Sequence, residues 1–303
     1  MQTFLPYADF RRTAEVLDSP RLGKQRVETL QILRALELPE YGWGNHPAVR
    51  MWRGYTPALV CYGLVCVDVW RGRGYGDSTA AQISEFAPEV SAISQPDLAR
   101  QGLVPSWLGD EALHRSHRSK LVAKDPDHYG PRFPGEQGDL DYLWPDPDDL
   151  PEPAPAPEGR HLWVLQPDSP AALGRFLDLG VVGFGTASGV DVDATGRELD
   201  DLRELVGSRG RRRPPRPLLA LARFLTEVEV ADEVAVLVQV GRALLVGEVR
   251  GDYEFAPRDD DGLRHRRRVR WDRVVPRSAV APPSALQDVR PLFAVRLALD
   301  PTA

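Results

Sequence analysis

The sequence has little sulfur and few lysines. Its 303 residues include two cysteines and two methionines. The cysteines, Cys61 and Cys66, lie in one apolar segment, which excludes a disulfide-rich scaffold and favours two reduced core side chains. The lysines are Lys24, Lys120 and Lys124, and all other side-chain cations are arginines. The amines that can form a Schiff base are therefore these lysines and the α-amine.

Long apolar runs are also absent. No run approaches the roughly 18 residues of a membrane-spanning helix, so no membrane partner is expected. The N-terminal stretch MQTFLPYADFRR places its basic residues after the apolar ones, unlike a secretory signal, and a cytoplasmic protein is expected. His114 and His117 have no Cys, Asp or Glu at a metal-binding spacing. We predict neither a metal nor a cofactor, and no obligate protein partner is evident.

The net charge of −6 gives no global attraction to nucleic acid. Residues 145–160 hold five acidic residues and one arginine, so this segment alone contributes −4 of the net charge of −6. Any DNA contact must come from local basic patches. The same segment is rich in proline and alanine and can form neither a helix nor a central strand. We predict an extended linker over 145–160 between two domains, 1–144 and 161–303.

Periodicity predicts a different fold class on each side of this linker. The first domain is expected to be all-α, with helices over 9–17, 20–37, 47–71 (which could be kinked at Pro57) and 111–123. The second is expected to be a small α+β barrel. Its expected strands cover 161–166, 181–185, 233–240, 242–249 and 267–271, its expected helices cover 171–179, 197–206 and 217–226, and Gly241–Arg242 is expected to form a tight hairpin turn.

One polar stripe stands out in the helix that Ser19 and Pro20 are expected to start. Because residues three and four apart share a helix face, Arg21, Lys24 and Glu28 lie together, with Gln31 one turn further on, while leucines occupy the opposite face. A carboxylate among cations near the N-terminus suits a site that acts on nucleic acid. The alternative is a solvated face with i,i+4 ion pairs.

Glu28 is the candidate catalytic residue in this stripe. Cleavage of a nucleotide's glycosidic bond builds positive charge on the sugar, which a nearby carboxylate stabilises. An amine can capture the sugar carbon as a Schiff base, and Met1 and Lys24 are the candidates. Lys24 lies one turn from Glu28 and could instead be its ion-pair partner. Arg21 is expected to contact phosphate or sugar.

Further residues of the first domain are candidate DNA contacts. His46, at a helix start, could contact phosphate or assist proton transfer, or it could cap the helix. Arg118, Lys120 and Lys124 belong to a basic run that is either a phosphate-contacting surface or a solvated helix. Base flipping also calls for aromatic side chains, although each candidate could equally be core. The candidates are Trp43, Trp52, Tyr55 and Trp107.

The second domain carries basic and aromatic candidates of its own. Arg211 and Arg212 lie in a basic, proline-containing loop and Arg267 in a basic strand. Both segments could follow a phosphate backbone, or be ordinary surface balanced by Asp259–Asp261. Four aromatic residues could form a base pocket or pack in the core: Trp163, Phe184, Tyr253 and Trp271.

Residues 1–133 resemble the pyrimidine-dimer DNA glycosylase family, which is helical. Glu28 falls at the family's catalytic glutamate, and the resemblance implies that Arg21 or Lys24 replaces its active-site arginines. NHPAVRMWRGY and WRGRGYGDS resemble its histidine-led helix and Arg-Gly-aromatic turn, and RSKLVAKDPDHY resembles its basic C-terminal segment. The family's nucleophile is the α-amine of a processed N-terminal residue. Here Gln2 should block removal of Met1, so Met1 itself, a lysine or water must serve.

Residues 161–299 resemble the PUA-like modules of the EVE type found in Mrr-like restriction proteins. The resemblance rests on LDLGVVGFG, ELDDLREL, GRALLVGEVRGDYEF and HRRRVRWDRVVPRSAV. Such modules bind nucleic acid and often hold a flipped, modified base. The two resemblances together imply a DNA glycosylase, with or without AP lyase activity, that excises a modified or damaged pyrimidine in anti-phage defence. The alternatives are repair of ultraviolet dimers, remodelling of hypermodified bases, and DNA binding without catalysis.

Overall fold

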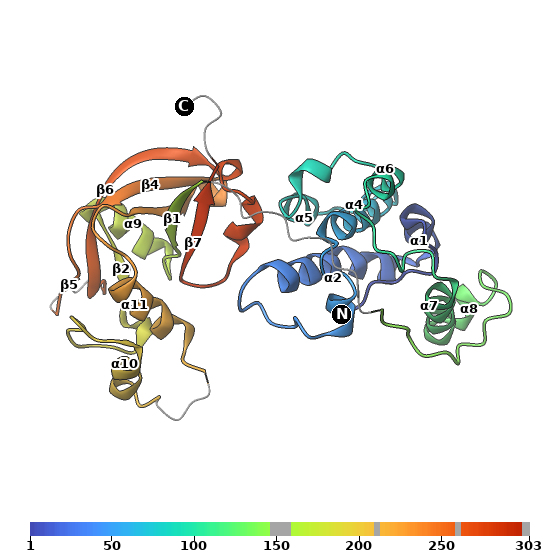
Figure 1. The fold of residues 1–303 in the computed structure, drawn as a ribbon, viewed down its shortest axis with the longest axis horizontal. Helices are drawn as coiled ribbons and strands as arrows, with labels where there is room; N and C mark the ends of the chain where they lie inside the picture. Colours follow the sequence, from blue (N-terminus) through green and yellow to red (C-terminus); the bar gives the residue numbers. More distant parts are fainter. Residues whose placement is uncertain (146–158, 209–212, 258–261, 299–303) are drawn as a thin grey trace. The chain divides into compact units, whose positions relative to one another are not determined.

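The chain divides into two compact units, Met1–Pro155 and Ala156–Ala303 (Figure 1). The computed structural model describes residues 1–145, 159–208, 213–257 and 262–298. Most of the predicted linker therefore lies outside the described residues, as do Arg211, Arg212 and the acidic run Asp259–Asp261.

The described part of the first unit is helical and contains no strand, which confirms the predicted class. Asp18, rather than the expected Ser19, is the N-cap of the long second helix, since its side chain accepts from the Arg21 N–H. The helices are α1 (Phe10–Val16), α2 (Ser19–Glu37), α3 (Pro47–Arg50), α4 (Thr56–Gly72), α5 (Ala80–Ser84), η1 (Pro88–Val90), α6 (Gln95–Arg100), α7 (Glu111–Lys124) and α8 (Pro126–Tyr129).

Helices α2 and α4 pack closely against each other and form the centre of this unit. A Cβ added at Gly63 on α4 would lie 2.6 Å from Thr29 Cγ2 on α2, so only glycine permits this approach. Tyr62 of α4, Phe10 of α1 and Trp52 are fully buried. The Phe10 and Tyr62 rings meet edge to face at 5.4 Å between centroids. This packing buries one face of α2 and leaves its polar stripe facing outward.

The single helix expected over 47–71 is two helices, α3 and α4. The break lies at Gly54, whose φ of 79° is left-handed, and at Tyr55, whose backbone is not helical. Pro57 then occupies the first turn of α4 rather than a kink. A proline is favourable there because its missing N–H would have no partner in the first turn.

The second unit is a mixed sheet with helices packed against it (Figure 1). Its strands are β1 (Arg160–Leu165), β2 (Val181–Phe184), β3 (Glu233–Val238), β4 (Ala243–Val249), β5 (Glu254–Phe255), β6 (His265–Pro276) and β7 (Leu292–Leu297). Its helices are α9 (Pro170–Leu179), η2 (Thr186–Ser188), α10 (Leu199–Leu205), α11 (Arg216–Thr226), η3 (Gln239–Gly241), η4 (Arg277–Ala279) and η5 (Pro283–Gln287).

The sheet has the order β2-β6-β4-β3-β1-β7, with β5 paired to β6, and it does not close. The expected barrel is therefore wrong. Helix α11 packs against both end strands: Phe224 meets Phe184 of β2 at 5.4 Å between ring centroids, and Arg223 donates to the Leu292 carbonyl of β7. A closed barrel would need β2 and β7 to pair with each other. Here side chains of α11 contact both strands instead.

Two further local expectations differ from the structure. The β3–β4 connection is not a two-residue turn at Gly241–Arg242, since Gln239, Val240 and Gly241 all have left-handed φ values of 51°, 56° and 78°. The edge strand β7 was not expected, although its burial pattern alternates towards its end. It pairs antiparallel with the whole of β1, from Arg160 opposite Leu297 onwards.

Candidate active site

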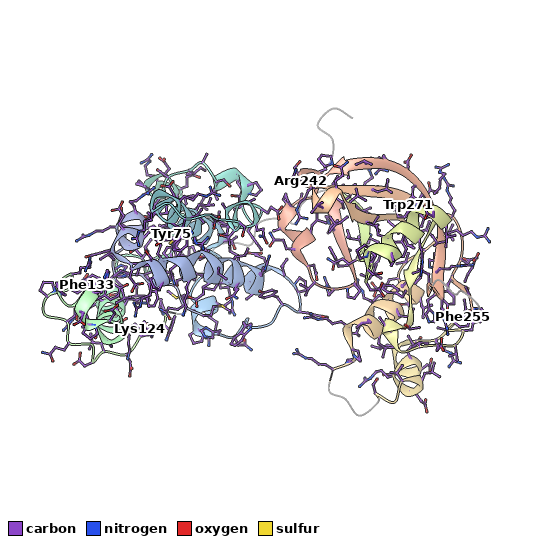
Figure 2. All side chains as sticks on the ribbon, turned by 180° about the vertical axis from the view of Figure 1, so that it is seen from behind. Tyr75, Lys124, Phe133, Arg242, Phe255 and Trp271 are labelled. Carbon is purple, nitrogen blue, oxygen red and sulfur yellow. The ribbon has the colours of Figure 1, made fainter. Side chains whose placement is uncertain are left out.

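A hollow of about 680 Å³ lies beside the N-terminus of the first unit. Its walls come from the N-terminal segment, the first turns of α2, the end of α7 and the segment after α8, which are far apart in sequence. The lining residues are Met1, Gln2, Phe4, Pro20, Arg21, Lys24, Glu28, Lys124 and Tyr142. All four predicted catalytic residues therefore meet at one place, together with Lys124, which is labelled in Figure 2.

Glu28 is half-buried in this hollow, and its Oε1 lies 3.9 Å from the α-amine nitrogen of Met1. Burial raises the pKa of the Glu28 carboxyl. The Met1 ammonium, Lys24, the Gln2 backbone N–H and the Gln25 side chain oppose this shift without cancelling it. The site thus pairs a carboxylate that holds its proton more tightly than usual with a primary amine.

Arg21 is a fixed cation at the edge of the hollow. It pairs with its own helix cap, Asp18, and its Nη1 lies 3.6 Å from Asp125. Its guanidinium also lies 5.3 Å from the centre of the Tyr129 ring. Burial lowers the pKa of Arg21, but the contacts with Asp18 and Tyr129 outweigh burial and the net shift is upward. Arg21 therefore keeps its charge and its place.

A second hollow of about 300 Å³ adjoins Met1 and is lined by Met1, Gln31, Tyr41 and Trp43. The Trp43 side chain is 64% exposed on a backbone with a left-handed φ of 65°. The three other aromatic candidates are core residues, less than a tenth exposed: Trp52, Tyr55 and Trp107. Only Trp43 among these four presents its ring to solvent.

His46 caps helix α3, since its Nδ1 accepts from the Ala48 N–H at 3.1 Å. Its ring contacts those of Trp43 and Trp144 edge to face. Burial and the nearby Met1 ammonium lower the pKa of His46. A neutral imidazole beside the amine fits the capping interpretation, and a direct phosphate contact stays a prediction.

The basic helix α7 does not present a row of free cations. Arg118 is largely buried and donates to the Pro6 carbonyl at 3.0 Å, with Glu111 and Glu136 as ion-pair partners. Lys120 Nζ lies 2.8 Å from Asp141. The structure thus brings Lys124 to the hollow and ties Arg118 and Lys120 to acidic neighbours.

Arg267 is the clearest correction among the predicted DNA contacts. Strand alternation turns its side chain inward, where it is 6% exposed. Its guanidinium donates to the Phe224 and Leu225 carbonyls at 3.4 Å, near the end of α11. Burial lowers the pKa of Arg267. Arg268 and Arg270, next along β6, are the exposed arginines of this strand.

The four aromatic candidates of the second unit do not form one pocket. Trp163 is buried and its indole N–H donates to Asp232 at 3.1 Å. The Trp271 indole, labelled in Figure 2, donates to the Phe176 carbonyl at 2.9 Å. The Tyr253 hydroxyl lies 2.8 Å from His265 Nδ1. These three are held by internal hydrogen bonds, while Phe184 lines a cavity.

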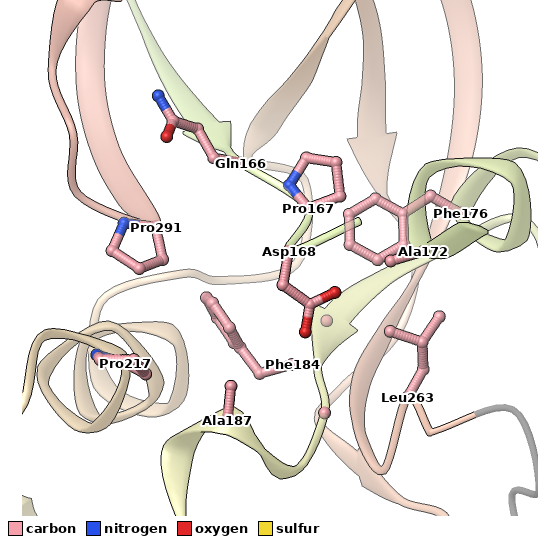
Figure 3. Close-up of a pocket in the computed structure, with 12 residues that line it drawn as sticks. Gln166, Pro167, Asp168, Ala172, Phe176, Phe184, Ala187, Pro217, Leu263 and Pro291 are labelled. Atoms are coloured by element: carbon pink, nitrogen blue, oxygen red, sulfur yellow. The ribbon is translucent and has the colours of Figure 1, made fainter. Parts of the chain in front are cut away.

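That cavity, of about 200 Å³, lies where β1, β2, α9 and α11 approach one another. In Figure 3 the Phe184 ring and the Asp168 carboxylate point into the same space, with Pro217 and Pro291 on the opposite side. Gln166 and Leu263 also line the cavity. It combines an aromatic face with polar groups, which is the composition of small-molecule sites.

Sequence reasoning missed several residues that build the first hollow. Gln25 is fully buried next to Glu28, His114 and His117 contact the N-terminal segment, and Tyr142 lines the hollow. The Tyr142 hydroxyl is buried without a hydrogen-bond partner in the described part of the chain. The sequence signal for Gln25 was a polar residue on the leucine-rich face of α2.

Cys61 and Cys66 are buried free thiols, and burial raises their pKa values to about 11 and about 12.

Among the described residues, no group of three or more His, Cys, Asp or Glu side chains could hold a metal ion. None of the helices in the described ranges is long and apolar enough to cross a membrane.

Comparison with known proteins gives two family matches. Residues 180–282 match a domain of unknown function, DUF8426, so the resemblance of this unit to EVE-type modules stays a prediction. No curated protein matches the chain, and no solved structure does. Residues 1–83, which carry Met1, the whole of α2 and Glu28, match the family of pyrimidine dimer DNA glycosylases.

Proposed function

We propose that the first unit is a DNA glycosylase that removes a damaged or modified pyrimidine, with the Met1 amine and Glu28 acting at the sugar carbon C1′. The observation that carries this proposal is the 3.9 Å separation of the two groups in one hollow. The family match of residues 1–83 supports it. Arg21, Lys24 and Lys124 line the same hollow and provide cations for the phosphates that flank the base.

In the proposed reaction, the lone pair of the neutral α-amine forms a bond to C1′ while the bond from C1′ to the base nitrogen breaks. The base leaves with that electron pair and takes a proton from solvent. Glu28 stabilises the positive charge that develops on the sugar. The amine proton then passes through Glu28 to O4′ as the sugar ring opens, which leaves a protonated Schiff base between Met1 and C1′.

The Schiff base also permits loss of the 3′ phosphate by elimination, which is the AP lyase step. Lys24 lines the same hollow and is the alternative amine, and direct attack by water is the third route. The routes differ in one observable. Borohydride reduces a Schiff base to a stable protein–DNA link, whereas attack by water leaves a free abasic site and no link.

Base release from three DNAs tests the function. Unmodified, ultraviolet-irradiated and hydroxymethyl- or glucosyl-cytosine DNA are incubated with the purified chain, and free base and abasic sites are measured. Release from irradiated DNA alone indicates repair, and release from hypermodified DNA alone indicates a role in anti-phage defence. Binding to all three without release contradicts a glycosylase and favours base remodelling or binding without catalysis.

A second role, reading of a modified base, is proposed for the second unit. The cavity lined by Phe184 and Asp168 supports it, since an aromatic ring can stack on a flipped base while the carboxylate hydrogen-bonds to its edge. In the full chain, Asp168→Asn should weaken binding to the preferred modified DNA about tenfold, the worth of one hydrogen bond to a charged group. Asp178→Asn, an exposed carboxylate on α9, is the matched control.

A further inference from the structure

Side chains, rather than a strand partner, hold the N-terminal segment in place. Phe4 and Leu5 are buried and lie in no helix or strand. The Phe4 N–H donates to Gln25 Oε1 at 2.9 Å, and the Leu5 N–H donates to His117 Nδ1 at 3.1 Å. An unpaired buried backbone group costs about 1–3 kcal/mol. These contacts therefore determine where the segment lies.

The two histidines of α7 have fixed tautomers. His114 Nε2 accepts from the Gly109 N–H at 3.1 Å, so its Nδ1 carries the proton and donates to the Leu5 carbonyl at 2.8 Å. His117 Nδ1 accepts from Leu5 and must be unprotonated there. Burial lowers the pKa of His117 to about 3, so the ring stays neutral at physiological pH. The pair contacts both polar groups of the Leu5 backbone.

Gln25 connects this segment to the candidate catalytic carboxylate. It is fully buried on α2, one turn before Glu28. Because its Oε1 accepts from Phe4, its Nε2 is the end that faces Glu28, and it donates to Oε2 at 3.3 Å. The Tyr62 hydroxyl lies 2.6 Å from Gln25 Oε1 and 2.9 Å from the Phe4 carbonyl. One amide thus contacts both the backbone that leads to Met1 and the carboxylate opposite Met1.

We infer that Gln25 is a positioning residue that holds the Met1-bearing segment and the Glu28 carboxylate in one hydrogen-bonded frame. The inference rests on the proposed glycosylase function. Met1 provides the reacting amine and Glu28 the charge, while Gln25 acts through both. The chain offers a matched control in Thr29, which is fully buried on the same helix and whose hydroxyl has no hydrogen-bond partner in the described ranges.

The first test compares Gln25→Met, which keeps the side-chain length without its polar atoms, with Thr29→Val. Under single-turnover conditions on the DNA that wild type cleaves, Gln25→Met should slow formation of the borohydride-trapped link about 100-fold, the cost of misplacing reacting groups by about 1 Å. DNA affinity should stay within about twofold of wild type. Thr29→Val should match wild type in both. An unchanged trapping rate in Gln25→Met overturns the inference.

The second test needs no DNA and separates the inference from the proposed function. The midpoint of the Glu28 carboxyl is measured by carbon-13 NMR titration. Since the hydrogen bond from Gln25 lowers the pKa of Glu28, Gln25→Met should raise this midpoint and Thr29→Val should not. A midpoint unchanged in Gln25→Met overturns the inference, even where the trapping rate falls, because the Gln25 amide then does not act on the Glu28 carboxyl.

The outcomes for the two proposals are distinct. A wild-type chain that releases no base and forms no link contradicts the proposed function, while the titration still decides whether Gln25 orients Glu28. Should Gln25→Met not fold, Tyr62→Phe replaces it, because this change removes the hydroxyl that holds Gln25 Oε1 and the Phe4 carbonyl. The same fall in rate and the same upward shift of the Glu28 midpoint are expected.

Discussion

The α-amine of Met1 lies 3.9 Å from Oε1 of Glu28, in a hollow that Arg21, Lys24 and Lys124 also line. A half-buried carboxylate, a primary amine and three cations are the groups needed to bind a phosphodiester and to stabilise positive charge on its sugar.

Glu28→Gln removes the charge but keeps the shape of the side chain. Base release should fall at least about 100-fold, because the developing charge on the sugar loses its partner, while DNA affinity changes less than about threefold. The measurement is single-turnover base release together with equilibrium binding. Glu37→Gln, at the exposed end of the same helix, is the control and should behave as wild type.

Glu28 should also affect stability in a pH-dependent way. Because its pKa is raised, the folded chain holds this proton more tightly than the unfolded chain. The resulting stabilisation is present below the unfolded value of about 4.3 and is lost as pH rises through the raised folded value. Glu28→Gln should match wild type in melting temperature near pH 4 and exceed it near pH 7. A constant difference at both pH values contradicts this account.

Arg267 and Arg268 should behave oppositely although they are neighbours on β6. Arg267→Ala should destabilise the chain by about 2 kcal/mol, because buried hydrogen bonds from a charged donor to the end of α11 are lost. Arg268 is exposed, and Arg268→Ala should leave the free energy of unfolding within about 0.5 kcal/mol. Urea denaturation measures both. Equal losses in the two variants would contradict a structural role for the buried Arg267 hydrogen bonds.

Trp43 should contribute to DNA binding and not to stability. Its ring is exposed beside Met1, so Trp43→Ala should weaken binding by about 1–3 kcal/mol through lost base stacking, with an unchanged melting temperature. Trp52→Ala, a change in the core, should instead cost about 3–5 kcal/mol of stability. Calorimetry and a binding titration on both variants separate the two roles, and full DNA affinity in Trp43→Ala would exclude a stacking role.

Local periodicity accounts for what could be predicted from the sequence. Arg21, Lys24 and Glu28 share a helix face through i,i+3 and i,i+4 spacing, and the structure places them in one hollow. Strand alternation also indicates that the Arg267 side chain points inward. Val269, two residues further along β6, lies on the same face and is buried. The predicted DNA contact rested on the number of basic residues in the strand and took no account of which face each one occupies.

Contacts between distant segments account for what could not be predicted. His117 meets Leu5 across 112 positions of sequence, and Gln25 meets Phe4 across 21. No periodicity within one element encodes such a contact. The open sheet was missed for a similar reason: packing of Phe224 against Phe184 brings α11 onto the edge strand β2, and a pattern of short strands does not reveal that.

The most direct measurement is borohydride trapping on the DNA from which wild type releases base, followed by mass spectrometry of the linked peptide. The account predicts that the DNA is attached to the α-amine of Met1 and that Glu28→Gln forms no link. Attachment to Lys24 or Lys124, or base release without any link, would contradict the assignment of Met1 as the nucleophile.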